Sequence, residues 1–196
     1  MFTEEKAFEP NVPYAAAKAG GDMLCRAYYN TFGVPVIVSH CSNNYGPYQF
    51  PEKLIPYLIT KAFNREQFPI YGDGKYIRDS LFVLYHVKAI DLMLHKGIAG
   101  EVYNIGGNNE KSNLEIAKLI LQYFGLPESI IKFVPYRPGH DRRYAIDATK
   151  IMNELGWYPE HRFEEAIPKT IEWYLHNQEW IAKIKQRNAD INEHIK

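Results

Sequence analysis

Tyr14 and Lys18, in the stretch VPYAAAKAGGD, are the first residues of the chain whose types and spacing could do chemistry. Residues four apart lie on one face of a helix, roughly one turn from each other. A lysine ammonium near a phenol favours the phenolate and so lowers the tyrosine pKa. Such a tyrosine is suited to act as general base towards the hydroxyl of a sugar or alcohol. An isolated Tyr-x-x-x-Lys is also common by chance as an ordinary surface pair, so its neighbours decide the interpretation.

The helix carries unusually small side chains next to this pair. They are Ala15, Ala16, Ala17, Ala19, Gly20 and Gly21. Two consecutive glycines cost roughly 1–2 kcal/mol of helix propensity relative to alanine. The pattern therefore predicts that something packs very close to this helix, either a cofactor, a strand or another helix. Tight packing of the helix on a sheet is the simplest alternative.

A second polar group follows the apolar segment VPVIVSHC, which is typical of a buried strand in a parallel sheet. In open α/β sheets, ligands bind beyond the carboxyl ends of the strands. Asn43 and Asn44 come at this place and offer amide donors and acceptors. Lys53 stands near the start of the next expected helix, where a phosphate would be favoured. A polar turn with an exposed lysine is an equally good interpretation of these residues alone.

The main cationic group outside the expected helices consists of Arg78, Arg137, His140, Arg142 and Arg143. The arginine fork suits bidentate contacts with phosphate. Solvated or salt-bridged arginines are the alternative, with equal weight for Arg142 and Arg143. The sequence has no Gly-x-Ser-x-Gly, His-Glu-x-x-His or Gly-x-Gly-x-x-Gly motif, and we expect no bound metal.

The elements that must position these groups alternate between helix and strand, which indicates an α/β chain whose second half is a smaller mixed lobe. Pro13 suits the first turn of a helix and Gly33 its end. Ser112 and Glu115 fit a capping box at the start of another helix, which Gly125 ends. We expect helices at about 13–32, 52–64, 85–95, 112–124, 147–156 and 163–177, strands at about 34–41, 101–107 and 131–137, and two short strands flanking Gly-Asp-Gly in 68–83.

Composition narrows the class of protein. The chain has 196 residues, enough for one sizeable domain or two small ones sharing a core, and it balances 23 basic against 23 acidic residues. No basic face points to nucleic acid, and no apolar run approaches the roughly 20 residues of a membrane span. The opening MFTEEKAFEP lacks the pattern of a signal peptide. Cys25 and Cys41 lie in apolar segments without Cys-x-x-Cys spacing, so we expect reduced core cysteines in a cytoplasmic protein.

Several stretches together resemble the extended short-chain dehydrogenase/reductases, and among these the family of dTDP-glucose 4,6-dehydratases. They are PYAAAKAGGD, VSHCSNNYGPYQFPEKLIP, PIYGDGKYIRD, EVYNIGGNNEKSN, RPGHDRRYAID and ELGWYP. They stand in the order and spacing of that family and cover nearly the whole chain. The Tyr-x-x-x-Lys pair alone indicates the superfamily. NNYGPYQFPEKLIP with RPGHDRRYAID is far more specific, and it favours the dehydratases over sugar-nucleotide epimerases and decarboxylases.

The resemblance implies a role for each matching residue. Tyr14 would remove the proton from the sugar O4 while hydride passes from C4 to NAD, and Lys18 would hold the nicotinamide ribose and tune Tyr14. Asn44 would lie at the nicotinamide end and Asn43 against the substrate. In this family water then leaves across C5–C6 and the hydride returns to C6, which gives a 4-keto-6-deoxy sugar. The dTDP-sugar pocket would be lined by Lys53, Leu54, Pro69, Ile70 and Tyr71, with Arg78 and Arg137 on the diphosphate and Asn113 and His140 on the nucleotide side.

In that family the Tyr/Lys helix lies in mid-chain, after a glycine-rich cofactor loop, most of the parallel sheet and an Asp-Glu pair that performs the dehydration. The resemblance therefore implies a C-terminal half. Residues 1–50 would end a NAD-binding Rossmann-type domain, and 51–196 would be mainly the substrate-binding lobe, with some segments returning to the Rossmann part. We expect such a chain to have no dehydratase turnover alone, and its binding of NAD by itself is in doubt. We also expect exposed apolar surface on its first helix and strand. Because family members commonly dimerise through this helix, we expect a homodimer or other self-association.

Three departures from the family pattern fall near the expected pocket. They are Leu84-Tyr85 in place of an acidic pair, Ser80 in place of a tryptophan and Tyr136 in place of an acidic residue. They fit either drift in a sequence freed from catalysis or a tuned choice of substrate. Two other functions stay open, namely an epimerase or dehydratase for another nucleotide sugar and a non-catalytic module that binds a nucleotide sugar or assembles with a partner.

Overall fold

The chain forms two compact units in a computed structural model that describes residues 1–135 and 142–193, with the backbone alone from residue 189. The first unit takes 1–44, 76–110 and 137–160, and the second takes 45–75, 111–136 and 161–196. Each unit is thus built from three separate stretches of sequence. The assignment of one part of the chain to a cofactor and another to a substrate stays a prediction.

A parallel pair of strands lies in the first unit. β1 (Val38–Cys41) pairs with β5 (Val102–Ile105), from Val38 opposite Val102 to Cys41 opposite Ile105. The strand expected at 34–41 is shorter than predicted. Pro35 has no N–H to give to a ladder, and the N–H of Val36 is used in a local turn to the carbonyl of Val34 (2.8 Å). The parallel pairing itself is confirmed.

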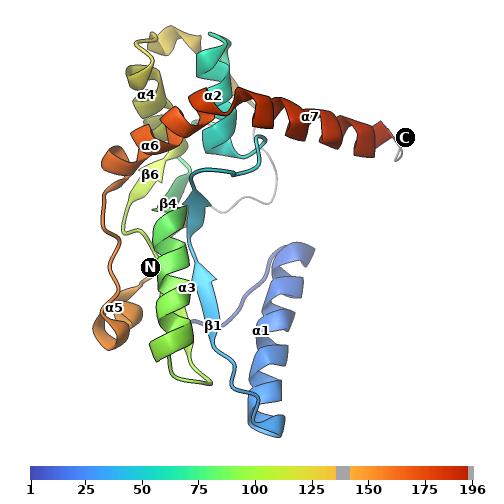
Figure 1. Cartoon of the computed structure of the whole chain (residues 1–196), viewed down its shortest axis with the longest axis vertical. Helices are drawn as coiled ribbons and strands as arrows, with labels where there is room; N and C mark the ends of the chain where they lie inside the picture. Colours follow the sequence, from blue (N-terminus) through green and yellow to red (C-terminus); the bar gives the residue numbers. More distant parts are fainter. Residues whose placement is uncertain (136–141, 194–196) are drawn as a thin grey trace. The chain divides into compact units, whose positions relative to one another are not determined.

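The helices of the first unit are α1 (Pro13–Phe32), α3 (Val83–Lys96) and α5 (Thr149–Leu155). α1 runs beside β1 (Figure 1). As expected, α1 begins with Pro13 and ends at Gly33, whose left-handed φ of 67° lets its N–H return to the carbonyl of Tyr29 at 2.9 Å. This arrangement brings the start of α1, with Tyr14 and Lys18, towards the carboxyl end of β1.

A second sheet has the strand order β2-β4-β6, where β2 is Asn43–Tyr45, β4 is Ile77–Phe82 and β6 is Glu110–Ser112. β8 (Arg143–Tyr144) also pairs with β4, in parallel. β3 (Phe68–Tyr71) pairs instead with β7 (Ile131–Val134), again in parallel. The two strands expected around Gly-Asp-Gly are therefore present, but each pairs with other strands, because the N–H of Gly72 goes to Val134 and extends the β3–β7 ladder.

The second unit packs four helices and a 3₁₀ turn, η1 (Glu128–Ile130), with the β3–β7 pair. The helices are α2 (Leu54–Phe63), α4 (Asn113–Tyr123), α6 (Phe163–His176) and α7 (Gln178–Glu193). α2 contacts α4, α6 and β3. The core of this unit is mainly apolar, although Thr170 is also buried in it. Its apolar members include Leu58, Ile59, Phe68, Ile70, Ile116, Ile120, Phe163 and Ile171. The expected capping box is confirmed, since Ser112 accepts the N–H of Glu115 and the Glu115 carboxylate accepts the N–H of Ser112.

The prediction of two core cysteines is wrong for Cys25. Its side chain is exposed and Cys41 is partly buried, and both are free thiols. The reason is that α1 has an uncovered apolar face, on which Met23, Leu24, Tyr28 and Phe32 are 59%, 62%, 53% and 69% exposed. The exposed apolar surface expected on this helix is thus confirmed. In the described part of the chain, no helix is long and apolar enough to cross a membrane.

Candidate functional site

Tyr14, Lys18 and Asp22 follow one another at intervals of four on α1 and so form one stripe along the helix. Asp22, the last residue of the stripe, contacts β1, because its carboxylate lies 2.9 Å from Nε2 of His40. Phe8 packs its ring edge-on against the same imidazole, with centroids 5.9 Å apart. Tyr14 is 74% exposed at the open end of the stripe. Its phenol is therefore free to meet a ligand.

Lys18 and Asn44 both act on Cys41, the last residue of β1. Burial raises the pKa of the Cys41 thiol, while the Asn44 amide and the charge of Lys18 oppose that rise. The Asn44 amide donates to the Cys41 sulfur and to the carbonyl of Ser42, each at 3.4 Å. The structure thus brings together two of the three residues predicted for the cofactor, at the carboxyl end of a parallel strand, where α/β proteins bind ligands.

The glycines of α1 do not pack against the described chain. A Cβ placed on Gly20 or Gly21 would meet no described atom within 4 Å. Tight packing on a sheet of this chain therefore does not explain these two glycines, although Ala19 of the same stripe is buried. The absence of side chains at Gly20 and Gly21 leaves open space on α1 near Lys18.

In the second unit, Lys53 and Leu54 begin α2. Lys53 is the N-cap residue, with an extended backbone and a carbonyl that accepts the N–H of Tyr57 at 2.9 Å. Its side chain is exposed, next to the unpaired N–H groups of the first helical turn. A cation and a helix N-terminus together favour an anion at this place.

The predicted residues of β3 divide between core and surface, as alternation along a strand requires. Ile70 is 1% exposed and packs inside, whereas Tyr71 is 48% exposed and Pro69 is partly buried. The turn after β3 lies against the start of α4, because the N–H of Leu114 donates to the carbonyl of Gly74 at 3.0 Å. Tyr71 and Asn113 therefore belong to element ends that meet, and Ile70 can offer a ligand only its backbone.

Some of the predicted arginines interact with other groups of the protein, and one lies outside the residues that the structure describes. Arg143 makes a bidentate pair with Glu110, with both N–O distances 2.6 Å, and this pair holds the pKa of Glu110 below its usual value. Arg142 lies over the ring of Tyr76 at 4.9 Å. Arg78 donates to the carbonyl of Ile77 at 2.7 Å. Arg137 and His140 lie outside the described residues.

The predicted site residues fall in both units. Tyr14, Lys18, Asn43, Asn44 and Arg78 belong to the first, and Lys53, Leu54, Pro69, Ile70, Tyr71 and Asn113 to the second. All three residues predicted to bind the cofactor are therefore in one unit. In residues 1–135 and 142–193, no group of three histidine, cysteine or acidic side chains could hold a metal ion.

Asp79 is a buried organising residue that the sequence reasoning missed. It is 1% exposed, and its carboxylate accepts the N–H of Gly107 at 2.8 Å and that of Asn109 at 2.9 Å. A Cβ on Gly107 would lie 2.5 Å from the carbonyl oxygen of Ser80. The signal for this contact was the double glycine of NIGG, which permits the close approach of two backbones.

Comparisons with known proteins agree on one group of enzymes. The family model described as GDP-mannose 4,6 dehydratase matches residues 1–170. A dTDP-glucose 4,6-dehydratase of Xanthomonas campestris pv. campestris is 52% identical over 192 residues, which cover 93% of this chain and 55% of that protein. The chain thus spans about half the length of the curated relatives it matches.

Solved structures give the same result. A dTDP-glucose 4,6-dehydratase from Bacillus anthracis in complex with NAD matches with a TM-score of 0.90 and 51% identity, over 93% of this chain and 58% of that one. DesIV, a dTDP-glucose 4,6-dehydratase from Streptomyces venezuelae with NAD and TYD bound, matches with a TM-score of 0.90 and 43% identity, over 93% and 57%. These matches confirm the α/β fold expected from the sequence, for the part of that fold that the chain spans.

Proposed function

Because the chain belongs to the family described as GDP-mannose 4,6 dehydratase and is homologous to dTDP-glucose 4,6-dehydratases, we propose that it supplies the Tyr/Lys pair and much of the nucleotide-sugar site of such an enzyme. The reaction would convert dTDP-glucose into dTDP-4-keto-6-deoxyglucose and water. The observation that carries the proposal is the hydrogen bond from Asn44 to Cys41 at the carboxyl end of β1, within reach of the charge of Lys18, with Tyr14 exposed on the same helical stripe as Lys18.

The residues around Cys41 fit the nicotinamide end of NAD. Lys18 offers an ammonium to ribose hydroxyls, Asn44 offers an amide, and the bare flank of Gly20 and Gly21 leaves room. NAD, when bound, supplies hydride acceptance from the sugar C4 and its return to C6. The part of this chain in that step is to take the O4 proton on the hydroxyl oxygen of Tyr14, with Lys18 one helical turn away.

The second unit would hold the nucleotide sugar. Lys53 and the N-terminus of α2 suit a phosphate, and the exposed ring of Tyr71 offers a stacking face for thymine. Asn113 stands on α4 next to the turn that follows β3 and would reach the nucleoside.

Nucleotide selectivity tests this proposal. We expect the purified chain to bind dTDP more tightly than UDP or GDP in isothermal titration calorimetry, because the enzymes it is similar to are dTDP-glucose 4,6-dehydratases. Lys53→Ala is expected to weaken dTDP binding about tenfold, since it removes one charge-assisted contact. Lys183→Ala, which removes a lysine that is 72% exposed on α7, is the matched control and should leave the affinity unchanged. Tighter binding of UDP or GDP would support the alternative of another nucleotide-sugar enzyme, and no nucleotide binding would reject the proposed site.

We also propose that the chain associates with itself through the uncovered face of α1. Leu24 on α1 and Leu94 on α3 are both strongly exposed, at 62% and 78%, and both helices carry further exposed apolar side chains. Of these two helices, α1 is the one whose apolar side chains lie beside bare glycines. Leu24→Glu is therefore expected to shift the chain to monomer in sedimentation velocity, because it places a charge in an apolar contact. Leu94→Glu is the control and should keep the wild-type mass. A monomeric wild type, or equal effects of the two changes, would contradict this surface.

A further inference from the structure

The segment from Tyr45 to Glu52 leads directly into Lys53 and has no regular ladder beyond Tyr45. Its backbone includes Tyr48 at a φ of 62°, in the left-handed region that tyrosine seldom adopts. Such a conformation persists only where neighbouring structure holds it. Within the second unit, this segment contacts α6 and α7.

α6 holds both ends of the turn at Gly46. The ring of Tyr45, which is 2% exposed, packs on Phe163 with centroids 4.8 Å apart. The buried hydroxyl of Tyr174 donates to the carbonyl of Gln49 at 2.5 Å and lies 3.4 Å from the carbonyl of Gly46. Burial raises the pKa of Tyr174, so this hydroxyl keeps its proton and stays a donor.

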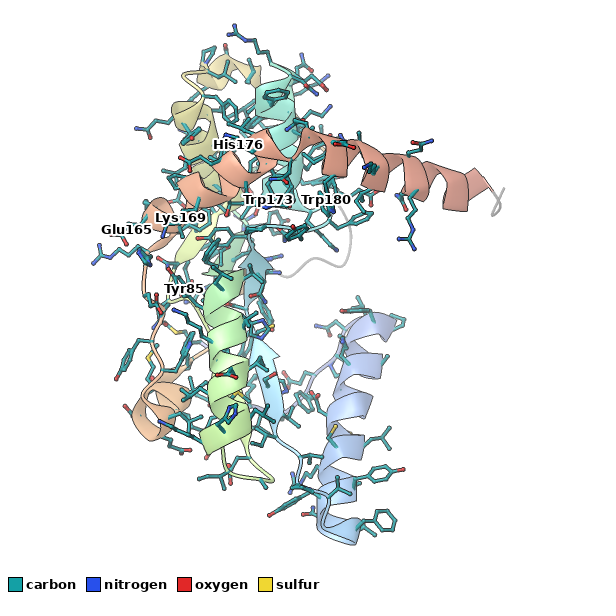
Figure 2. All side chains as sticks on the ribbon, in the orientation of Figure 1. Tyr85, Glu165, Lys169, Trp173, His176 and Trp180 are labelled. Carbon is teal, nitrogen blue, oxygen red and sulfur yellow. The ribbon has the colours of Figure 1, made fainter. Side chains whose placement is uncertain are left out.

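An aromatic group fixes the middle of the segment. Trp173 on α6 and Trp180 on α7 lie next to each other where one helix passes into the next (Figure 2), with ring centroids 5.2 Å apart. Tyr48 packs on both, at 4.5 Å from Trp173 and 5.5 Å from Trp180. The ring of Tyr48 therefore bridges the two helices, although its side chain is 67% exposed.

The end of the segment sets the start of α2. The side chain of Glu52 accepts from the amide of Asn188 on α7 at 2.9 Å. The N–H of Lys53 donates to the carbonyl of Phe50 at 3.0 Å, and the carbonyl of Lys53 opens the first turn of α2. The position of Lys53 therefore depends on the preceding segment, which contacts α6 and α7.

We infer that Tyr48, Trp173, Tyr174 and Trp180 form an aromatic clasp that positions Lys53 for the diphosphate of a nucleotide. This inference rests on the proposed function, because it names how the proposed phosphate contact is held. The four residues touch no ligand. They are positioning residues that act through the backbone of 46–52. The clasp gives the helix pair α6–α7 a part in ligand binding in addition to its part in the core.

The test combines hydrogen exchange without ligand and affinity for dTDP, measured on the purified chain. Trp180→Ala opens the clasp, and Tyr174→Phe removes only its hydroxyl. Both are expected to speed amide exchange in peptides covering 45–53 and to weaken dTDP binding about tenfold, the loss expected when the Lys53 contact is misplaced. Tyr48→Phe keeps the bridging ring and should behave as wild type. Lys169→Ala, on the exposed side of α6 (Figure 2), is the control for helix changes outside the clasp.

The outcomes separate the clasp from the proposed function. If Trp180→Ala and Tyr174→Phe bind dTDP as tightly as the wild type, or leave exchange in 45–53 unchanged, the clasp does not position Lys53 and the inference is overturned. Faster exchange throughout the chain would indicate general loosening and would also overturn it. A wild type that binds no dTDP rejects the proposed function and the inference with it. Loss of binding in the two clasp variants alone, with a loosened 45–53 segment, supports it.

Discussion

Tyr14→Phe is expected to lower turnover of dTDP-glucose by about 10²–10⁴-fold, because it removes the hydroxyl that takes the O4 proton in the proposed step. The ring stays, and Tyr14 is 74% exposed, so neither the fold nor ligand contacts of the ring should change. Turnover is measured in an enzyme in which this chain is joined to the part of the Xanthomonas relative that it does not cover. Binding of dTDP-glucose should stay within about threefold of wild type, since the lost interaction belongs to the transition state.

Tyr28→Phe is the matched control for this change. Tyr28 lies on the same helix, is 53% exposed and packs on Phe32 at 5.5 Å. Its hydroxyl has no part in the proposed chemistry, so turnover should match the wild type. If Tyr14→Phe kept full turnover, or if both changes lowered it equally, Tyr14 would not be the base. Equal loss of substrate binding and turnover in Tyr14→Phe would instead indicate a role in binding.

The parts of the fold that local chemistry specifies could be predicted from the sequence. Pro13 and Gly33 marked the two ends of α1, because proline tolerates the first turn and glycine accepts a left-handed end. Ser112 and Glu115 marked the start of α4 through their reciprocal hydrogen bonds.

Long-range pairing was harder to predict. The Gly-Asp-Gly turn predicted two strands, but a turn does not specify which distant strand each of them pairs with. In the structure, β3 pairs with β7. Cys25 was expected in the core because its neighbours are apolar, yet burial requires a covering surface that α1 lacks in the described chain. The bidentate pairing of Arg143 with Glu110, 33 residues away in sequence, likewise follows only from the tertiary structure.

The candidate site shows the same division. The spacing of Tyr14 and Lys18 and the family resemblance for Asn44 predicted a common site. The structure adds Cys41, which accepts a hydrogen bond from Asn44 and lies within reach of the Lys18 charge. The residues that support the site could not be found in this way. Asp79 and Tyr174 act on backbone groups far away in sequence, and their roles appear only when their hydrogen bonds are known.

Asp79→Ala is expected to lower the free energy of unfolding by about 2–5 kcal/mol, because it leaves the N–H groups of Gly107 and Asn109 without their acceptor. The hydrogen bond from Gly107 is buried and that from Asn109 is partly buried. The carbonyl of Ser80 already lies against Gly107, so the backbone has little room to find another partner. Urea unfolding followed by circular dichroism measures the change. The larger values of this loss in the free energy of unfolding apply if water does not enter the site.

Asp91→Ala is the control for the loss of a carboxylate. Asp91 lies on α3 with its side chain 75% exposed, and its change should alter the free energy of unfolding by no more than about 0.5 kcal/mol. Asp79→Asn should fall between these two, since its amide oxygen can still accept one of the two N–H groups. If Asp79→Ala unfolded with the same free energy as Asp91→Ala, solvent would be replacing the carboxylate. The close approach of Gly107 to Ser80 would then not depend on Asp79. The expected order of stability, Asp91→Ala above Asp79→Asn above Asp79→Ala, instead makes Asp79 the residue that fixes the turn after β5 against β4.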